Sequence, residues 1–348
     1  MIDFSKLLPE EIENIIFELQ NILPIVKKDK NTTYKYINNE KNEIVCPTCK
    51  SVNCIKNGHT KSYIQTYKCN DCKRRFNDIS GTVLEHTKLN YQQVEIFFEC
   101  MDNKLSIRKT AKKMGVNKST VFLLRHKVLD ILSNIRKNIA LKGKTQVDEK
   151  HESINLKGTK TENMPRYSKP RSTKGGSKRG VSKHQVCIAS AIDETDQCFF
   201  EIVGTGPITT EQIRIAFSNK INSVDILITD CKSSYEKFAS ENGLRLEQVK
   251  SGTYVNENGF NLSEINSLHS GLDTFLSIFR GVSTKHLQGY LDWYTFQKLI
   301  HYTVDVLKHV SYTMKQIIVK PTSINSKNIF KSTCVINFNE IYSDYHHA

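Results

Sequence analysis

Four cysteines have the residue type and the spacing of zinc ligands. They form two Cys-X-X-Cys pairs, Cys46 with Cys49 and Cys69 with Cys72, and nineteen residues separate the pairs. Two intervening residues let one tight turn aim both thiolates at a tetrahedral ion. Because a site closed by four thiolates leaves no position for a substrate, the pattern predicts a structural zinc ion that folds this module.

Two other potential zinc ligands, Cys54 and His59, fall between the pairs. We expect both to be bystanders, although either could replace one of the four cysteines. Gly58 and the strand-like segment Tyr63–Tyr67 fit a hairpin that joins the two turns. The early acid in Met1–Phe4 predicts that no secretory signal is present, so disulfides between the ten cysteines are not expected.

Two aspartates end strand-like segments and could bind a harder metal ion. Asp148 ends the segment Thr145–Asp148, Asp230 ends the segment Asp225–Asp230, and both segments are typical of strands. Mg²⁺ prefers oxygen ligands, and a two-ion site for phosphoryl transfer needs carboxylates that converge from different elements. A single aspartate at a strand end is more often a cap or turn residue, but the pair favours a catalytic centre.

The chain is basic, and its basic residues are concentrated in two segments. It has 50 Lys and Arg against 36 Asp and Glu, a net charge of +14. Residues 41–142 hold 20 basic and 8 acidic side chains, and residues 157–183 hold 9 basic side chains and one acidic one. Concentrated positive charge favours a polyanionic partner, most often nucleic acid, over an evenly solvated basic surface. The second segment is expected to be a disordered, solvated loop in the free protein, and it could order against DNA at the active site.

Residues 105–135 have the pattern of a helix-turn-helix. Gly115 can supply the positive φ of the tight turn, and Asn117 or Lys118 can cap the second helix. In this motif the start of the second helix enters the major groove of DNA. The predicted DNA-contact residues there are Ser119, Thr120 and Arg125. The alternative is an ordinary helical hairpin with a basic surface.

Apolar periodicity predicts several further elements. These are a packing helix over 7–23, strands over 185–193 and 198–203, and helices over 208–217, 233–242 and 263–279. Short strands alternating with helices after residue 142 indicate a domain that mixes both element types.

Several short motifs occur in a fixed order along the chain. They are Tyr67-Lys68-Cys69, Arg75-Phe76, Gly81-Thr82, Val147-Asp148-Glu149, Ile228-Thr229-Asp230, Ile265–Ser270 and Gly281–Leu291. Together they resemble the zinc-ribbon DDE transposases of bacterial insertion sequences, the group with an ISXO-like transposase domain. The resemblance runs from about residue 7 to about residue 299, and its longest and most specific block is Gly281–Leu291.

This resemblance implies an RNase H-like fold and cleavage and joining of DNA ends that depend on Mg²⁺ or Mn²⁺. The family's catalytic, magnesium-binding positions fall on Asp148, Asp230 and Asn266. Related transposases carry either Glu or Asn at the third position, and an amide oxygen can ligate a hard ion with less charge than a carboxylate. His269 lies one turn after Asn266, where it could touch DNA or a metal-bound water, or simply pack.

Three positions depart from the family pattern. The family has a basic residue seven positions after the third ligand, where this chain has Asp273. It has Arg two positions before that, where this chain has Gly271, and His five positions before the third ligand, where this chain has Asn261. Since positions i and i+7 share one helix face, Asp273 is expected to face DNA and to repel it.

We therefore expect a multi-domain α+β protein, with a zinc ribbon and a helix-turn-helix followed by an RNase H-like α/β catalytic domain that has a mixed sheet. The expected boundaries are 1–40 for an N-terminal helix and linker, 41–82 for the zinc ribbon, 88–140 for the helix-turn-helix and connector helix, 141–305 for the catalytic domain with its basic insert 157–183, and 306–348 for a tail of unknown role.

The favoured function is that of an insertion-sequence transposase with structural Zn²⁺ and catalytic Mg²⁺ or Mn²⁺. Its expected partners are double-stranded DNA, as element terminal repeats and target, and further copies of the chain assembled on DNA. The expected location is the cytoplasm, at the bacterial nucleoid, with no membrane partner. Two alternatives stay open: a catalytically impaired or non-catalytic DNA-binding regulator, and a nuclease that does not join strands.

Overall fold

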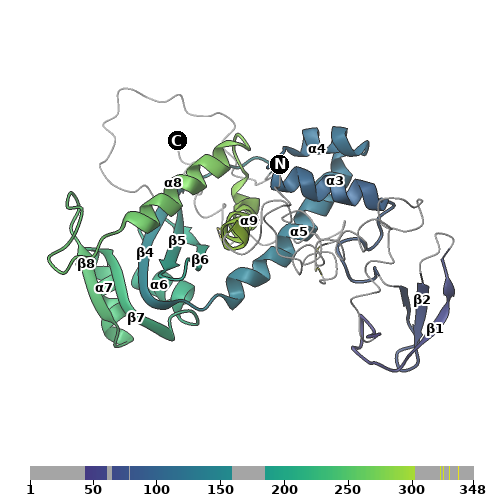
Figure 1. The fold of residues 1–348 in the computed structure, drawn as a ribbon, viewed down its shortest axis with the longest axis horizontal. Helices are drawn as coiled ribbons and strands as arrows, with labels where there is room; N and C mark the ends of the chain where they lie inside the picture. Colours follow the sequence, from purple (N-terminus) through teal and green to yellow (C-terminus); the bar gives the residue numbers. More distant parts are fainter. Residues whose placement is uncertain are drawn as a thin grey trace, which may run out of the picture. The chain divides into compact units, whose positions relative to one another are not determined.

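The computed structural model describes residues 44–60, 65–77, 79–158 and 185–301, together with residues 322, 324, 329 and 336 (Figure 1). The helix predicted over 7–23, most of the basic insert and almost all of the C-terminal tail lie outside the described residues. The chain divides into two compact units, which comprise residues 1–124 with 310–322 and residues 125–309 with 323–348. Within the described ranges we find no helix whose length and apolar content would let it cross a lipid bilayer.

The first unit contains a small antiparallel sheet. Its strands, in spatial order, are β1 (Cys54–His59), β2 (Gln65–Cys69) and β3 (Arg75–Asn77). Tyr67 of β2 stacks on Phe76 of β3 with ring centroids 5.5 Å apart, and the two rings form a small buried core with Cys46 and Cys69. Because so few apolar side chains stabilise a fold only weakly, this module depends on another source of stability.

Three helices follow the small sheet: α3 (Tyr91–Asp102), α4 (Ile107–Met114) and α5 (Lys118–Asn138). Gly115 ends α4 in the left-handed region with a φ of 65°. The side-chain oxygen of Asn117 then accepts a hydrogen bond of 2.9 Å from the Ser119 N–H, so Asn117 caps α5. The predicted pair of helices with its tight turn is therefore present. α5 begins in the first unit and ends in the second.

The second unit is built on a five-stranded mixed sheet. Its strands are β4 (Lys142–Ser153), β5 (Gln185–Asp193), β6 (Cys198–Thr205), β7 (Ser223–Asp230) and β8 (Arg245–Val249). The spatial order is β6-β5-β4-β7-β8. Strand β5 runs antiparallel to both β4 and β6, whereas β7 runs parallel to both β4 and β8. β5 is buried along almost its whole length, which explains why most of its residues are apolar.

Helices cover both faces of this sheet (Figure 1). They are α6 (Thr210–Phe217), α7 (Ser233–Glu241), α8 (Ser263–Ser277) and α9 (Thr284–His301). Phe217 of α6 and Tyr235 of α7 pack into a core with Val147 of β4. On the other face, Gln146 accepts a hydrogen bond of 3.0 Å from the Ile265 N–H of α8. Because successive strand residues point to opposite faces, the residues of β4 with even numbers face α8.

The predicted elements were incomplete in two respects. Asp148 does not end its strand, because β4 continues to Ser153 and pairs with β5 along the way. β8, α3 and α9 were not predicted as separate elements. The strand over 185–193 was predicted with its observed bounds, and α7 and α8 end one and two residues earlier than predicted.

Polar contacts fasten α9 to β6 and to the end of α5. The Gln288 side chain accepts a hydrogen bond from the Ile202 N–H (2.8 Å) and donates one to the Phe200 carbonyl (3.0 Å). Asp292, which is 1% exposed, accepts a hydrogen bond of 2.9 Å from Arg136 of α5. These hydrogen bonds give α9 a defined position on the sheet, although the second carboxylate oxygen of Asp292 is buried without a partner.

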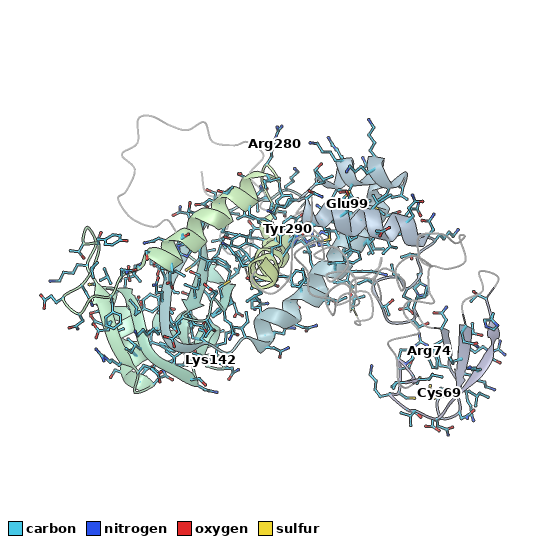
Figure 2. The ribbon with its side chains drawn as sticks, viewed as in Figure 1. Cys69, Arg74, Glu99, Lys142, Arg280 and Tyr290 are labelled. Atoms are coloured by element: carbon cyan, nitrogen blue, oxygen red, sulfur yellow. The ribbon has the colours of Figure 1, made fainter. Side chains whose placement is uncertain are left out.

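Close packing accounts for much of the block 281–291. Tyr290, labelled in Figure 2, lies on α9 with its ring centroid 4.9 Å from that of Phe279 and 5.7 Å from that of Trp293. Gly289 approaches α5 so closely that an added Cβ would lie 3.1 Å from the Leu129 Cβ. The most specific block of the resemblance therefore joins helices in this fold.

We expect the contribution of the His126 and His286 pair to the free energy of unfolding of the second unit to fall as the pH drops below about 6.5. The rings of His126 on α5 and His286 on α9 have centroids 4.3 Å apart. Burial, then the neighbouring His286 and Arg125, lower the pKa of His126 to about 3. Burial, then Lys285, lower the pKa of His286 to about 4. The unfolded chain takes up protons that the folded chain does not, so stability present above pH 6.5 is lost below it.

Thermal unfolding at pH 7.5 and pH 5.0 measures this effect. At pH 5 the loss from His126 alone is on the order of 2 kcal/mol. His126→Gln should flatten the pH dependence. His86→Gln should leave it unchanged, since the His86 side chain is 88% exposed. An equal pH dependence in His126→Gln and the native protein would contradict this assignment.

Candidate metal centre and carboxylate site

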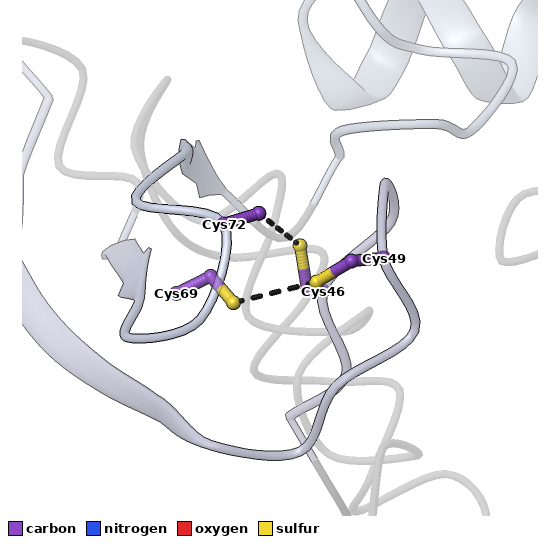
Figure 3. Close-up of side chains that lie close together, drawn as sticks. All are labelled: Cys46, Cys49, Cys69 and Cys72. Atoms are coloured by element: carbon purple, nitrogen blue, oxygen red, sulfur yellow. Dashed lines mark hydrogen bonds between the residues drawn. The ribbon is translucent and has the colours of Figure 1, made fainter.

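The four predicted zinc ligands form a compact cluster in the first unit (Figure 3). Their sulfur atoms all lie within 4.8 Å of one another. The Sγ atoms of Cys46 and Cys72 are 3.5 Å apart, and those of Cys49 and Cys69 are 3.6 Å apart. Four Zn–S bonds of about 2.3 Å in a tetrahedron place the sulfurs about 3.8 Å apart. The residues present therefore fit a zinc ion.

Two similar turns position these sulfurs. Each Cys-X-X-Cys pair is followed by a lysine in the left-handed region, Lys50 with φ 63° and Lys73 with φ 62°. The turns direct the backbone N–H of the second cysteine at the sulfur of the first. These hydrogen bonds lower the pKa of Cys46 to about 6 and lower the pKa of Cys69. The thiolate that they stabilise is the form that binds metal.

The two potential ligands that lie between the cysteine pairs, Cys54 and His59, stay outside this cluster. The Cys54 thiol donates to the Ser51 carbonyl at 3.5 Å, and His59 is the last residue of β1. Among the described residues, neither belongs to a group of ligand atoms that could hold a metal ion. The expectation that Cys54 and His59 are bystanders agrees with this geometry.

Asp148 and Asp230 lie level with each other at the end of the parallel strand pair. Gln146 of β4 is paired with Ile228 of β7. Each aspartate is two residues further along its strand, so both point to the face of the sheet that α8 covers. The negative charge of Asp230 also acts on the carboxyl group of Asp148. The structure therefore brings the two predicted carboxylates together.

Polar groups from three elements surround Asp148. Its Oδ1 accepts a hydrogen bond of 2.9 Å from the Glu149 N–H, and its Oδ2 lies 3.8 Å from Nδ1 of His269 on α8. The Ser190 hydroxyl of β5 donates to the Asp148 carbonyl at 2.7 Å and lies 2.6 Å from Nε2 of His269. Burial, and then the charge of Glu149, raise the pKa of Asp148 to about 7 against the opposing effect of Lys232. A cation beside Asp148 would relieve this cost.

His269 is a neutral neighbour of this site. Burial, and then the charge of Lys150, lower its pKa to about 4. Its Nε2 is hydrogen-bonded to the Ser190 hydroxyl, and its Nδ1 faces the Asp148 carboxylate at 3.8 Å. The sequence left its role open between DNA contact and packing; the structure places it against Asp148.

One oxygen of Asp230 is buried without a partner. Its Oδ2 is 2.8 Å from the Lys232 Nζ, whereas its Oδ1 has no hydrogen bond and is not accessible to solvent. A buried carboxylate oxygen without a partner is costly, and a metal ion would satisfy it. The oxygen chemistry of this pair therefore fits a hard divalent cation such as Mg²⁺ or Mn²⁺.

A third carboxylate, that of Glu149, lies behind the pair of aspartates on the other face of β4. Its side chain is 3% exposed, contacts the Lys232 ammonium and accepts a hydrogen bond of 3.3 Å from the Tyr235 hydroxyl of α7. Sequence reasoning quoted Glu149 as part of a motif but did not assign roles to Lys232 or Tyr235. The available signal was the position of Lys232, two residues after Asp230.

Asn266, the third predicted ligand, lies on α8 and is exposed. It is one turn before His269 on a helix that crosses the face carrying Asp148. In the described part of the chain, no hydrogen bond joins its amide to Asp148 or Asp230. The structure thus brings the two aspartates together and places Asn266 on the covering helix.

Two of the unusual residues on α8 have partners within the second unit. The carboxylate of Asp273 lies 2.7 Å from the Lys150 ammonium of β4, which offsets the repulsion of DNA that the sequence suggested. An added Cβ at Gly271 would lie 2.2 Å from the Tyr294 hydroxyl, which itself donates to the Leu268 carbonyl. Any larger side chain at position 271 would therefore require the Tyr294 side chain to move.

The predicted DNA-contact residues separate into two groups. Ser119 is exposed and Thr120 is half-buried at the start of α5. The prediction for Arg125 was wrong, because its side chain is 1% exposed and its guanidinium lies 5.4 Å from the Trp293 ring centroid. Exposed cations lie instead on the preceding helix α4, together with Lys118 at the start of α5; those of α4 are Arg108, Lys109, Lys112 and Lys113.

The chain is similar in sequence to a protein of a transposable element. An uncharacterized protein in transposable element ISH50 of Halobacterium salinarum is 26% identical over 254 residues, which are 72% of this chain and 84% of that protein. No family model matches the chain. Two solved structures, a pre-cleavage Mos1 transpososome and the Mos1 strand transfer complex, each match 66% of this chain at 12% identity and a TM-score of 0.21. The match covers 81% of the chain in the first structure and 80% of the chain in the second. A TM-score of 0.21 does not establish a shared fold.

Proposed function

We propose that this chain is an insertion-sequence transposase that binds element ends and catalyses metal-dependent DNA cleavage and strand transfer. One observation carries the proposal: Asp148 and Asp230 lie level at the end of a parallel strand pair, with one buried carboxylate oxygen left unpartnered. The sequence similarity to a transposable-element protein supports it. The strand order, with three antiparallel strands beside two parallel ones, supports an RNase H-like catalytic domain.

In this proposal Asp148 and Asp230 hold Mg²⁺ or Mn²⁺, with Asn266 supplied from α8. When bound, the ions activate water and stabilise the entering and leaving oxygens of a phosphodiester. The Glu149 N–H donates to the Asp148 carboxylate and orients it, and the imidazole of His269 packs beside it. Attack of water on the phosphodiester at the element end breaks the bond between phosphorus and the 3′-oxygen and frees a 3′-hydroxyl. This hydroxyl then attacks a phosphodiester of the target DNA and displaces the 3′-oxygen of the target strand.

The first unit serves DNA binding in this proposal. The zinc ribbon folds on its metal, and the helix pair α4 and α5 presents basic side chains to phosphates. Two element ends must be held together for joining, so the active form on DNA is an assembly of several copies.

We expect the exposed lysines of α4 to contribute strongly to DNA affinity. Lys112→Ala/Lys113→Ala removes two charges that face solvent. The double variant should bind element-end DNA about tenfold more weakly, and its slope of log affinity against log salt should be about two units shallower. Fluorescence anisotropy across a salt series measures both quantities.

Lys137→Ala/Lys237→Ala is the matched control, since both of these exposed lysines belong to the second unit. It removes the same charge and should change the slope much less. Equal slopes for the two double variants would show that net charge, and not α4, governs DNA binding.

A cleavage and joining assay tests the proposed function as a whole. The zinc-loaded full chain is incubated with DNA that carries the element ends, in Mg²⁺ or Mn²⁺, and nicked and joined products are separated. Joined products support a transposase. Cleavage without joining identifies a nuclease. Salt-sensitive binding without cleavage identifies the non-catalytic DNA-binding regulator.

A further inference from the structure

Lys232 occupies the point where the acidic side chains of the second unit converge. It lies in the connection between β7 and α7, two residues after Asp230. Its ammonium is 2.8 Å from Asp230 Oδ2 and also contacts Glu149 Oε1. One lysine side chain therefore joins carboxylates from two neighbouring strands and from both faces of the sheet.

The charges at this point do not balance without Lys232. Asp148, Glu149 and Asp230 act on one another electrostatically. Among the described residues, no lysine or arginine other than Lys232 forms an ion pair with any of these three carboxylates. Like charges this close destabilise the fold unless a cation lies between them. The ammonium therefore does in the folded protein what a metal ion would otherwise do.

We infer that Lys232 is a positioning residue that acts as an internal counter-ion: it holds Asp230 and Glu149 in the absence of a divalent ion and withdraws when the ion binds. This inference rests on the proposed function, because it assumes a divalent-ion site at Asp148 and Asp230. It assigns that site a metal affinity set by competition with the protein's own lysine.

Two features let Lys232 leave this position. Its side chain is 43% exposed, so its flexible stem can turn toward solvent without crossing the core. Asp230 already has one oxygen on the lysine and the other buried without a partner. An incoming ion can bind the carboxylate oxygen of Asp230 that has no partner, and the ion and the ammonium then repel each other.

The expected consequence is tighter binding of divalent ions when the lysine charge is removed. Mn²⁺ binding to the zinc-loaded full chain is measured by titration calorimetry. Lys232→Met should bind Mn²⁺ at least about tenfold more tightly than the native protein, because no cation has to be displaced. Lys232→Gln, which keeps a polar side chain without charge, should shift the affinity in the same direction. Lys237→Met, an exposed lysine on α7, is the matched control and should leave it unchanged.

Thermal unfolding gives a second readout that does not depend on activity. In buffer free of added divalent ions, Lys232→Met should unfold at a lower temperature than the native protein, because Asp230 and Glu149 lose their counter-ion. At saturating Mn²⁺ this difference should disappear. A metal-independent difference would overturn the inference, since the lysine would then stabilise the fold whether or not the ion is bound.

Asp148→Asn separates failure of this inference from failure of the proposed function. If Mn²⁺ binding is lost in Asp148→Asn but is unchanged or weaker in Lys232→Met and Lys232→Gln, the ion site stands and the role of Lys232 is refuted. If Asp148→Asn binds Mn²⁺ as well as the native protein does, the ion does not bind at this site, and the proposed function fails together with the inference.

Discussion

Replacement of Asp148 or Asp230 by asparagine is expected to reduce cleavage of element-end DNA by at least about a thousandfold, which corresponds to about 4 kcal/mol of transition-state stabilisation. Each substitution removes a negative charge but keeps the size of the side chain. The two carboxylates come from different strands and meet at one point, so neither can replace the other. Gel separation of nicked products from labelled DNA measures the rate.

Asp225→Asn is the control for this prediction. Asp225 lies on the same strand as Asp230, is exposed, and precedes the site by five residues. Its replacement should leave cleavage unchanged, and all three variants should bind DNA with native affinity. Native cleavage rates in Asp148→Asn and Asp230→Asn would show that catalysis occurs elsewhere in the chain.

Replacement of Cys69 by serine is expected to abolish zinc binding and to unfold the first module. The free energy of zinc binding to such sites is about 10–16 kcal/mol, and the buried core of this module is too small to compensate. Elemental analysis should find the zinc content reduced to a small fraction of the native value. Affinity for DNA should fall at least about tenfold, because the unfolded ribbon no longer contributes to binding.

The matched control is Cys54→Ser, which changes a cysteine of the same module outside the cluster. This variant should retain zinc and DNA affinity. The thermal transition of the second unit should be unaffected by either change, since the two units form separate compact bodies. Full zinc content in Cys69→Ser would refute the assignment of this residue as a ligand.

The predictions that agree with the structure rest on patterns that are local in sequence. Two residues between paired cysteines define a turn, and both turns recur with a lysine of positive φ after the second cysteine. Gly115 is the residue that tolerates the left-handed conformation at the end of α4, and it adopts that conformation. Apolar composition sufficed for the bounds of β5, because a strand buried on both faces is mostly apolar on both.

Other predictions were incomplete because the deciding partner is distant in sequence. Arg125 follows two predicted DNA contacts on a basic helix, yet Trp293, far along the chain, covers it. Asp273 was judged by its helix position alone, whereas Lys150 of β4 neutralises part of its charge. In each case the spacing gives the direction of a side chain along its own element, but not the element that packs against it.

The sequence by itself determined the ligand types and the strands that carry the two aspartates. Only the tertiary structure decided that β4 and β7 pair in parallel with Gln146 opposite Ile228, which sets Asp148 level with Asp230. It also decided that Lys232 reaches Glu149 on the neighbouring strand. The physical reason is that strand register and ion pairing depend on contacts between segments about eighty residues apart, and no periodicity in either segment records those contacts.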